Sequence, residues 1–250
     1  MMAIHIYLFV LGLILGSFFN VVGLSVPAGH SFANRRSACP SCGRTLTFFE
    51  LIPVFSYMLQ VGKCRGCKAR ISPLYPAVEM LTGVLFASAP IFLGWSSELL
   101  VGWILISLFM IIFVTDVAFM LIPDKILLFF IVIFIVLRVS FPLTPWWDSI
   151  VGAAVGFSLL LSIAVVSKGG MGGGDIKLFA VIGFVLGMKM VLLSLLFACF
   201  YGALLGITGL LTGILKKKTL IPFGPYIVFG TLTAYFWGDS LLHWYVTFLR

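Results

Sequence analysis

Long apolar runs alternate with short polar connectors along almost the whole chain. The runs cover residues 4–25, 76–95, 99–122, 125–141, 149–167, 176–188, 189–215 and 222–238. A helix that crosses a bilayer needs roughly 20 mainly apolar residues, so most of these runs are long enough and the sixth is short. The pattern predicts an all-α polytopic membrane protein with about eight transmembrane helices. The first run lacks a basic start and a cleavage site, which indicates a retained span.

One polar segment, residues 26–75, separates the first span from the second. It divides the expected organisation into a first transmembrane helix (1–25), a polar loop domain (26–75) and a multi-span domain (76–250). The composition agrees with this division, because 62% of the 250 residues are hydrophobic and 10% are charged. A soluble chain carries about a quarter of its residues as charges. The composition therefore excludes a soluble globular domain.

The basic residues indicate how the chain is oriented in the membrane. Seven lie in the polar segment: Arg35, Arg36, Arg44, Lys63, Arg65, Lys68 and Arg70. If that segment is cytoplasmic, alternation of the spans places the N-terminus outside. All 16 basic residues except Arg138, Lys189 and Arg250 then lie on the cytoplasmic side, as the positive-inside rule requires. The net charge of +8 reflects this distribution, and without interleaved aromatic residues it does not indicate direct binding of nucleic acid.

Glycines spaced four residues apart occur inside the expected spans. The pairs are Gly12/Gly16, Gly152/Gly156, Gly183/Gly187, Gly202/Gly206 and Gly209/Gly213. In lipid, helices associate through close backbone approach, which small residues allow. These pairs therefore predict helix–helix packing surfaces.

Four cysteines form two C-x-x-C knuckles in the polar segment. They are Cys39, Cys42, Cys64 and Cys67. Four thiolates at this spacing are typical of a structural tetrahedral Zn²⁺ site. Two disulfides are the alternative, which the reducing cytoplasmic side disfavours. The fifth cysteine, Cys199, lies in an apolar run and is expected to be a buried small hydrophobe.

Three aspartates stand in or beside apolar runs, where an ionisable group indicates function. Asp116 lies near the cytoplasmic end of the third run, Asp124 follows Pro123 at the interface, and Asp175 follows a glycine-rich segment. The topology places Asp116 and Asp175 at one membrane face, where two close carboxylates share a proton and can activate water. The alternative is that the aspartates form structural ion pairs, Asp116 or Asp124 with Lys125 and Asp175 with Lys177.

Several segments together resemble the type IV prepilin peptidases, most closely the competence-type enzymes of Gram-positive bacteria. The segments are Gly16–Val22, the paired knuckles, Glu50–Tyr57, Ile71–Glu79, Asp116 with Leu121–Asp124, Gly172–Leu178 and Pro222–Pro225. The resemblance implies an aspartic endopeptidase of the bacterial inner membrane. Such enzymes remove the basic leader of prepilins and pseudopilins at the cytoplasmic face, after a glycine, and serve pilus assembly, secretion or DNA uptake.

The same resemblance implies roles for individual residues. Asp116 and Asp175 correspond to the catalytic pair. Asp124, Gly172, Gly174 and Lys177 correspond to supporting positions around it. Many members also methylate the new N-terminal amine from S-adenosylmethionine with the 26–75 loop. Glu50 in this loop and Glu79 shortly after it are the acidic candidates for binding the methyl donor. Prepilin and pseudopilin precursors and membrane lipid are the expected partners.

Two other functions fit parts of the sequence. A presenilin-type intramembrane aspartic protease uses a related G-x-G-D pair, but it leaves the zinc loop unexplained and cuts inside an apolar segment. A carboxylate-relay transporter, or a scaffold that presents a zinc knuckle, is expected to have charges near the bilayer midplane. Here the charges gather at the cytoplasmic boundary.

Overall fold

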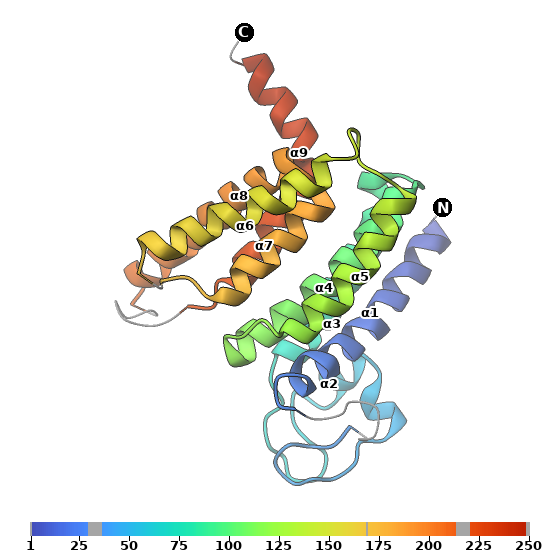
Figure 1. Ribbon diagram of the computed structural model, residues 1–250. Helices are drawn as coiled ribbons and strands as arrows, with labels where there is room; N and C mark the ends of the chain where they lie inside the picture. Colours follow the sequence, from blue (N-terminus) through green and yellow to red (C-terminus); the bar gives the residue numbers. More distant parts are fainter. Residues whose placement is uncertain (1, 30–36, 169, 214–220, 249–250) are drawn as a thin grey trace. The chain divides into compact units, whose positions relative to one another are not determined.

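The computed structural model describes residues 2–29, 37–168, 170–213 and 221–248 (Figure 1). The basic residues Arg35, Arg36, Lys216, Lys217, Lys218 and Arg250 lie outside these ranges. Within them the chain forms nine α-helices and one short 3-10 helix, with two isolated β-bridges and no strand. The predicted all-α class is therefore confirmed.

Each of the eight apolar runs corresponds to one helix. These helices are α1 (Met2–Ser25), α3 (Leu74–Leu93), α4 (Ser97–Phe119), α5 (Asp124–Ser140), α6 (Asp148–Val166), α7 (Gly173–Leu186), α8 (Met188–Leu211) and α9 (Gly224–Phe248). Among the described residues, α1, α3, α4, α6 and α8 are each long and apolar enough to cross a membrane alone. The protein is thus a multi-pass membrane protein. The polar segment contributes only η1 (Phe48–Leu51) and α2 (Phe55–Leu59).

The chain divides into two compact units, and the first contains residues 1–95 and 102–118. In it α1 and α3 pack antiparallel along their whole length. A Cβ on Gly12 or Gly16 would lie 2.8 Å from backbone atoms of α3, so only glycine allows this approach. Hydrogen bonds close both ends of the pair, from Asn20 to the Tyr75 carbonyl at 3.1 Å and between His5 and the Ala87 carbonyl at 2.8 Å.

The second unit contains residues 96–101 and 119–250. Glycines again allow its closest contact, in which α6 and α7 run antiparallel. A Cβ on Gly152 would lie 2.2 Å from the Gly183 carbonyl oxygen, and one on Gly156 would lie 2.4 Å from the Phe179 carbonyl oxygen. These glycine pairs confirm the predicted packing surfaces. Gly206 and Gly213 differ, because no described atom lies within 4 Å of the position of either Cβ, and Gly213 lies after the end of α8.

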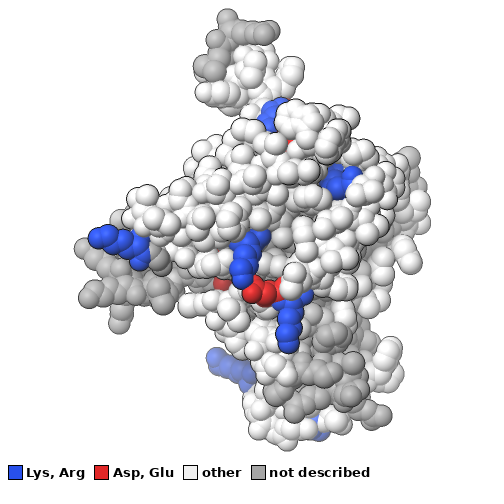
Figure 2. Space-filling view, viewed as in Figure 1, with Lys and Arg blue, Asp and Glu red and all other residues white. Residues whose placement is uncertain are grey.

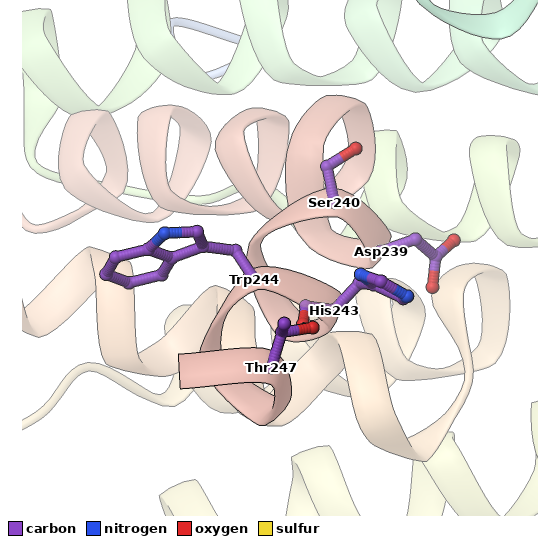
Figure 3. A pocket seen from close by; sticks show the side chains of 5 residues that line it. All are labelled: Asp239, Ser240, His243, Trp244 and Thr247. Atoms are coloured by element: carbon purple, nitrogen blue, oxygen red, sulfur yellow. The ribbon is translucent and has the colours of Figure 1, made fainter. Parts of the chain in front are cut away.

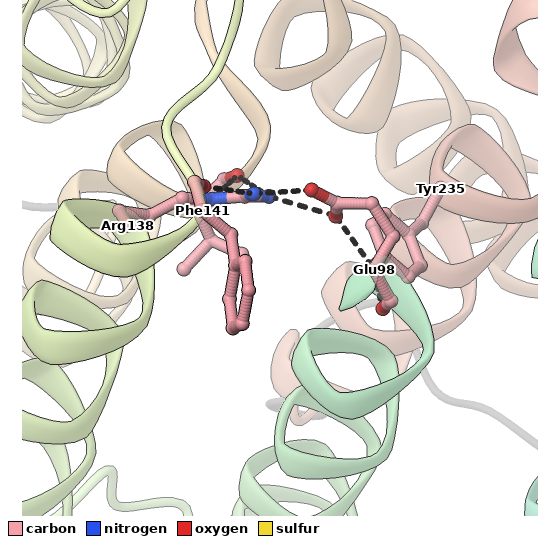
Figure 4. Close-up of polar contacts among 5 residues, drawn as sticks. Glu98, Arg138, Phe141 and Tyr235 are labelled. Atoms are coloured by element: carbon pink, nitrogen blue, oxygen red, sulfur yellow. Dashed lines mark hydrogen bonds and ion pairs between the residues drawn. The ribbon is translucent and has the colours of Figure 1, made fainter. Parts of the chain in front are cut away.

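A polar cluster around the buried Arg138 joins four helices of the second unit (Figure 4). The Arg138 guanidinium at the end of α5 donates to both carboxylate oxygens of Glu98, at 2.5 and 3.1 Å, and to the Val185 carbonyl of α7, at 2.6 and 2.9 Å. The Tyr235 hydroxyl of α9 donates to the Glu98 carbonyl at 3.0 Å. Arg138 therefore ties the first turn of α4 to the last turn of α7.

Replacing Arg138 by methionine should destabilise the protein substantially. The arginine side chain is only 3% exposed but its partner Glu98 is 39% exposed, so the loss of the pair and of the hydrogen bonds to the Val185 carbonyl should cost about 2 kcal/mol. For a chain of this size that loss lowers the melting temperature by roughly 4–8 °C. Thermal unfolding in detergent measures it, with Glu98→Gln as the control, in which the glutamine side-chain oxygen and the Val185 carbonyl still accept hydrogen bonds from the guanidinium. Equal melting temperatures for Arg138→Met and the parent would contradict this role.

Candidate active site and metal centre

The two C-x-x-C segments fold into the same turn. In the first, the Cys39 N–H donates to the Arg44 carbonyl at 2.9 Å, and in the second the Cys64 N–H donates to the Ala69 carbonyl at 2.9 Å. Each turn is closed by one antiparallel bridge, Ala38 with Thr45 and Lys63 with Arg70. Gly43 and Lys68 occupy the matching position in the two knuckles, and both have positive φ, 70° and 61°.

The knuckles bring all four thiol groups together. The Sγ atoms of Cys39, Cys42, Cys64 and Cys67 all lie within 4.8 Å of one another, and all four cysteines are free. Cys39 Sγ and Cys67 Sγ are 3.8 Å apart, which matches the edge of about 3.8 Å that a tetrahedron with Zn–S bonds of about 2.3 Å has. These residues fit a metal ion, and four thiolates in a closed tetrahedron are the ligand set of a structural Zn²⁺ site.

Backbone N–H groups prepare one of these thiols to bind a metal. The N–H groups of Cys67 and Gly66 donate toward Cys64 Sγ and lower the pKa of this thiol to about 6, whereas burial and the neighbouring thiols raise the pKa of Cys67 to about 11. A metal ligand must be the thiolate, which the lowered pKa of Cys64 favours at neutral pH. By contrast Cys199, expected to be buried, is exposed on α8. The apolar residues around Cys199 therefore form a helix surface suited to contact with lipid, and they do not form part of a protein core.

Glu50 is held in the loop by residues that sequence analysis did not single out. Its Oε2 accepts hydrogen bonds from the Thr47 N–H and hydroxyl, each at 2.9 Å, and its Oε1 pairs with the Arg44 guanidinium. The Thr47 N–H and the Arg44 guanidinium lower the pKa of Glu50 from 4.5 to about 2. This stabilisation is present above pH 4.5 and is lost only as the pH falls toward 2. The Thr-x-x-Glu spacing of a capping box was the available signal.

Glu79, the second acidic candidate for the methyltransferase, lies in the second turn of α3. Its Oε2 accepts a hydrogen bond from the Val54 N–H at 2.7 Å. Val54 precedes α2 and has a φ of 62°, a conformation that a β-branched residue rarely adopts. The buried carboxylate therefore fixes the loop onto the helix. Glu50 and Glu79 are held by different groups in the loop, Glu50 by Arg44 and Thr47 and Glu79 by Val54.

The G-x-G-D segment forms the start of α7. Gly172 is the residue before the helix, and the Asp175 N–H donates to its carbonyl at 3.1 Å. A Cβ on Gly172 would lie 3.2 Å from Asp175 Oδ2, so glycine leaves room for the carboxylate. Asp175 is 9% exposed in this first turn, where the helix dipole stabilises a negative charge.

The connector between α4 and α5 packs against this turn. A Cβ on Gly174 would lie 2.8 Å from Ile122 Cβ. Next to that contact, Lys177 Nζ lies 2.8 and 2.7 Å from the two carboxylate oxygens of Asp124. Lys177 is thus paired with Asp124, where sequence analysis had considered a pair with Asp175. Two contacts hold the start of α7 to the connector that follows Asp116.

Asp116 lies one turn before the end of α4 and is 6% exposed. The two residues before it are buried: Thr115 donates from its hydroxyl to the Ile112 carbonyl at 3.0 Å, and Val114 packs against Gly23 of α1. α4 ends at Phe119, and α5 begins at Asp124, directly after Pro123. Asp116 and Asp175 are thus both buried carboxylates within one turn of a helix end.

Gly174→Ala should reduce the activity of a site that uses Asp175. The added methyl group would lie within contact of Ile122 and push the first turn of α7 away from the connector. Displacing a reacting group by about 1 Å costs up to 10²-fold in rate. Gly173→Ala is the matched control, because no described atom lies within 4 Å of its added Cβ. Rates for the two variants on one substrate give the comparison, and equal rates would show that the contact has no role.

A hollow near the C-terminal end of α9 offers a different group of polar side chains (Figure 3). Asp239, Ser240, His243, Trp244 and Thr247 line it, all from this one helix. The labelled side chains spread along the helix and do not converge on a common point (Figure 3). On the face seen in Figure 2, uncharged residues cover most of the surface and charged residues occur in a few small groups. The buried aspartates and the cysteine cluster are therefore the better candidates for chemistry.

Two family profiles match the sequence. The first, described as the bacterial peptidase A24 N-terminal domain, matches residues 10–93. The second, described as the type IV leader peptidase family, matches residues 103–207. The first match includes all four cysteines, Glu50 and Glu79, and the second includes Asp116 and Asp175.

Curated proteins are similar over nearly the full length. A prepilin leader peptidase/N-methyltransferase of Bacillus subtilis (strain 168) is 49% identical over 239 residues, which cover 96% of each chain. Proteins with the same description from Aeromonas salmonicida (strain A449) and Stutzerimonas stutzeri are 36% and 33% identical. These alignments cover 85% and 96% of this chain and 75% and 93% of the relatives. No solved structure matches the chain.

Proposed function

We propose that this chain, which belongs to the type IV leader peptidase family, removes the leader of type IV prepilins and pseudopilins and N-methylates the new N-terminus. The observation that carries the proposal is the 49% identity with a prepilin leader peptidase/N-methyltransferase over 96% of both chains. A peptidase and a methyltransferase activity in one chain also account for the two family profiles, which match separate segments.

Asp116 and Asp175 are the catalytic pair in this proposal. Both carboxylates are buried, and each lies near the end of a helix. In the topology proposed from the basic residues, both helix ends lie at the cytoplasmic face of the membrane. Carboxylates that approach each other in a poorly solvated site share one proton, because two negative charges there are costly. The ionised carboxylate then takes a proton from water, and the protonated one donates a hydrogen bond to the scissile carbonyl.

The reaction needs no covalent intermediate on the enzyme. Water attacks the carbonyl carbon of the glycine that ends the leader, and its oxygen stays with the leader as part of the new carboxylate. The C–N bond breaks when the leaving nitrogen receives a proton from the carboxyl pair. Gly172, Gly174, Asp124 and Lys177 position Asp175, since they shape the first turn of α7 and hold it against the connector after α4.

Methylation is assigned to residues 26–75, and cleavage to residues 76–250. The four cysteines would hold a structural Zn²⁺, which folds the loop and takes no part in either reaction. Glu50 and Glu79 support the methyltransferase by shaping the loop, because both accept hydrogen bonds from groups within it. S-adenosylmethionine is the methyl donor, a substrate of this second step.

The enzyme would reside in the bacterial inner membrane with its N-terminus outside. The positive-inside rule supports this orientation, since Arg44, Lys63, Arg65, Lys68 and Arg70 all lie in the loop that it makes cytoplasmic. Cleavage then occurs at the cytoplasmic face, where prepilin leaders reside. Membrane lipid surrounds the spans, and direct contact with nucleic acid has no part in the function.

The position of the cut tests the proposed peptidase. The full-length chain is co-expressed with a prepilin, and the N-terminus of the product is sequenced. The expected product begins directly after the glycine at the end of the basic leader. A product that begins inside the apolar segment would indicate a presenilin-type protease instead. No product from any prepilin, together with proton-coupled flux in vesicles, would favour a transporter.

A further inference from the structure

Large apolar side chains are exposed in the loop between α1 and α3, outside every membrane-spanning helix. We call them the apolar strip, which consists of Phe48, Phe49, Phe55, Met58, Leu59 and Val61. Each is between 63% and 80% exposed. Contiguous exposed apolar groups on a protein surface mark a site of interaction with another protein or a membrane. No described residue of the loop covers the apolar strip, which is therefore available to a partner.

No exposed charge interrupts the apolar strip. Between residues 47 and 62 the only Asp, Glu, Lys or Arg is Glu50. Its side chain is 1% exposed and is paired with Arg44. A charge moved out of water is costly unless it is paired. Because Glu50 is paired inside the loop, the apolar strip exposes no charge between residues 47 and 62, and it can enter an environment of low dielectric such as the membrane interface.

The apolar strip is fixed at the level where two spans end. The Val54 N–H, between its two halves, donates to Glu79 in the second turn of α3 at 2.7 Å. Beside it, Asn20 in the last turns of α1 donates to the Tyr75 carbonyl at 3.1 Å. Both α1 and α3 are long and apolar enough to cross a membrane. A segment attached to their ends lies at the interface of the bilayer.

Positive charge borders the apolar strip on the side of the second knuckle. Lys63, Arg65, Lys68 and Arg70 are all exposed there, and a hollow lined by Tyr57, Lys63 and Arg70 lies beside the end of α2. Basic residues next to a membrane attract anionic headgroups. Apolar side chains with a basic border are typical of segments that lie in the interface plane.

From these contacts we propose that the apolar strip is inserted into the membrane interface. Acyl chains surround its apolar side chains, and anionic phospholipid headgroups bind at Lys63 and Arg70. The lipid bilayer, not another protein, is the occupant. The four-cysteine loop then lies against the membrane surface instead of extending into water. This inference holds whether or not the chain is a peptidase, because it rests only on the loop and the spans that carry it.

The test places a fluorescent amino acid at Met58 in the full-length chain. The protein is reconstituted in vesicles of phosphatidylcholine and phosphatidylglycerol, and the same probe at Arg65 is the control. We expect nitroxide-labelled acyl chains to quench the probe at position 58 and iodide in the water to quench the probe at position 65. The double variant Phe55→Ser/Leu59→Ser should expose position 58 to iodide, with the zinc content unchanged. Phe55→Leu/Leu59→Met should keep the parent pattern.

Two results would overturn the proposal. Equal quenching by iodide at positions 58 and 65 would place the apolar strip in water. Protection of position 58 only after a prepilin is added would make the occupant the apolar helix of the substrate. Both conclusions can be drawn from a preparation without peptidase activity, since the quenching measurement requires no cleavage.

Discussion

Asp116→Asn and Asp175→Asn should each abolish cleavage of a prepilin. Asparagine keeps the size of the side chain but can neither take a proton from water nor share one with the other carboxylate. General acid–base catalysis contributes about 10²–10⁴-fold to a rate, so losing one member leaves cleavage at the limit of detection. Because both positions act on the same step, the double variant should be no slower than either single variant. Single-turnover cleavage by the purified variants measures the loss.

The control for these variants is Asp239→Asn. Asp239 has a side chain that is 88% exposed, and its Oδ1 lies 3.8 Å from Lys189 Nζ. It should cleave at the parent rate, because an exposed aspartate on α9 has no part in the reaction. Full cleavage by Asp116→Asn or Asp175→Asn, in protein that inserts and unfolds like the parent, would exclude the carboxylate pair.

Cys64→Ser should remove the metal ion and with it the methyl transfer. A serine hydroxyl does not replace a thiolate on Zn²⁺, and the binding of a structural zinc contributes about 10–16 kcal/mol to the folding of small zinc domains. The knuckles then lose the arrangement that brings their four Sγ atoms within 4.8 Å. Cleavage should decline less than methylation, since Asp116 and Asp175 lie outside residues 26–75. Metal analysis and the two activities are measured on the same preparation.

The control is Cys199→Ser, which changes the one cysteine outside the cluster. Cys199 is exposed on α8 and should keep both the zinc content and the two activities of the parent. Equal zinc in Cys64→Ser and in the parent would refute the metal site. Loss of cleavage as complete as the loss of methylation would show that the loop is needed for both steps.

The helices and the metal site could be predicted from the sequence because each depends on a local pattern. A bilayer-spanning helix satisfies its own backbone hydrogen bonds, so the apolar runs indicate the helices directly. The C-x-x-C spacing fixes each knuckle, and four such ligands leave one geometry for the metal. The glycines at 12 and 152 likewise indicated packing surfaces that the structure has.

Partners distant in the sequence could not be predicted in the same way. Lys177 pairs with Asp124, 53 residues away, because α5 and α7 start beside each other. Arg138 was expected only as an outer flanking charge, yet it joins α5 to α4 and α7. The basic residues and cysteines of residues 26–75 predict a polar loop. Its apolar strip could not be identified from the sequence, because only the fold shows that the side chains of Phe48 and Leu59 are exposed among the described residues.

The measurement that tests the central claim most directly is the intact mass of a prepilin after incubation with the purified chain and S-adenosylmethionine. If one chain carries both activities, the product lacks its leader and gains the mass of one methyl group, and neither change occurs without the enzyme. Leader loss without a methyl group would remove the methyltransferase from the account. An unchanged prepilin mass, with protein that holds its zinc and unfolds cooperatively, would contradict the assignment of Asp116 and Asp175 as a peptidase site.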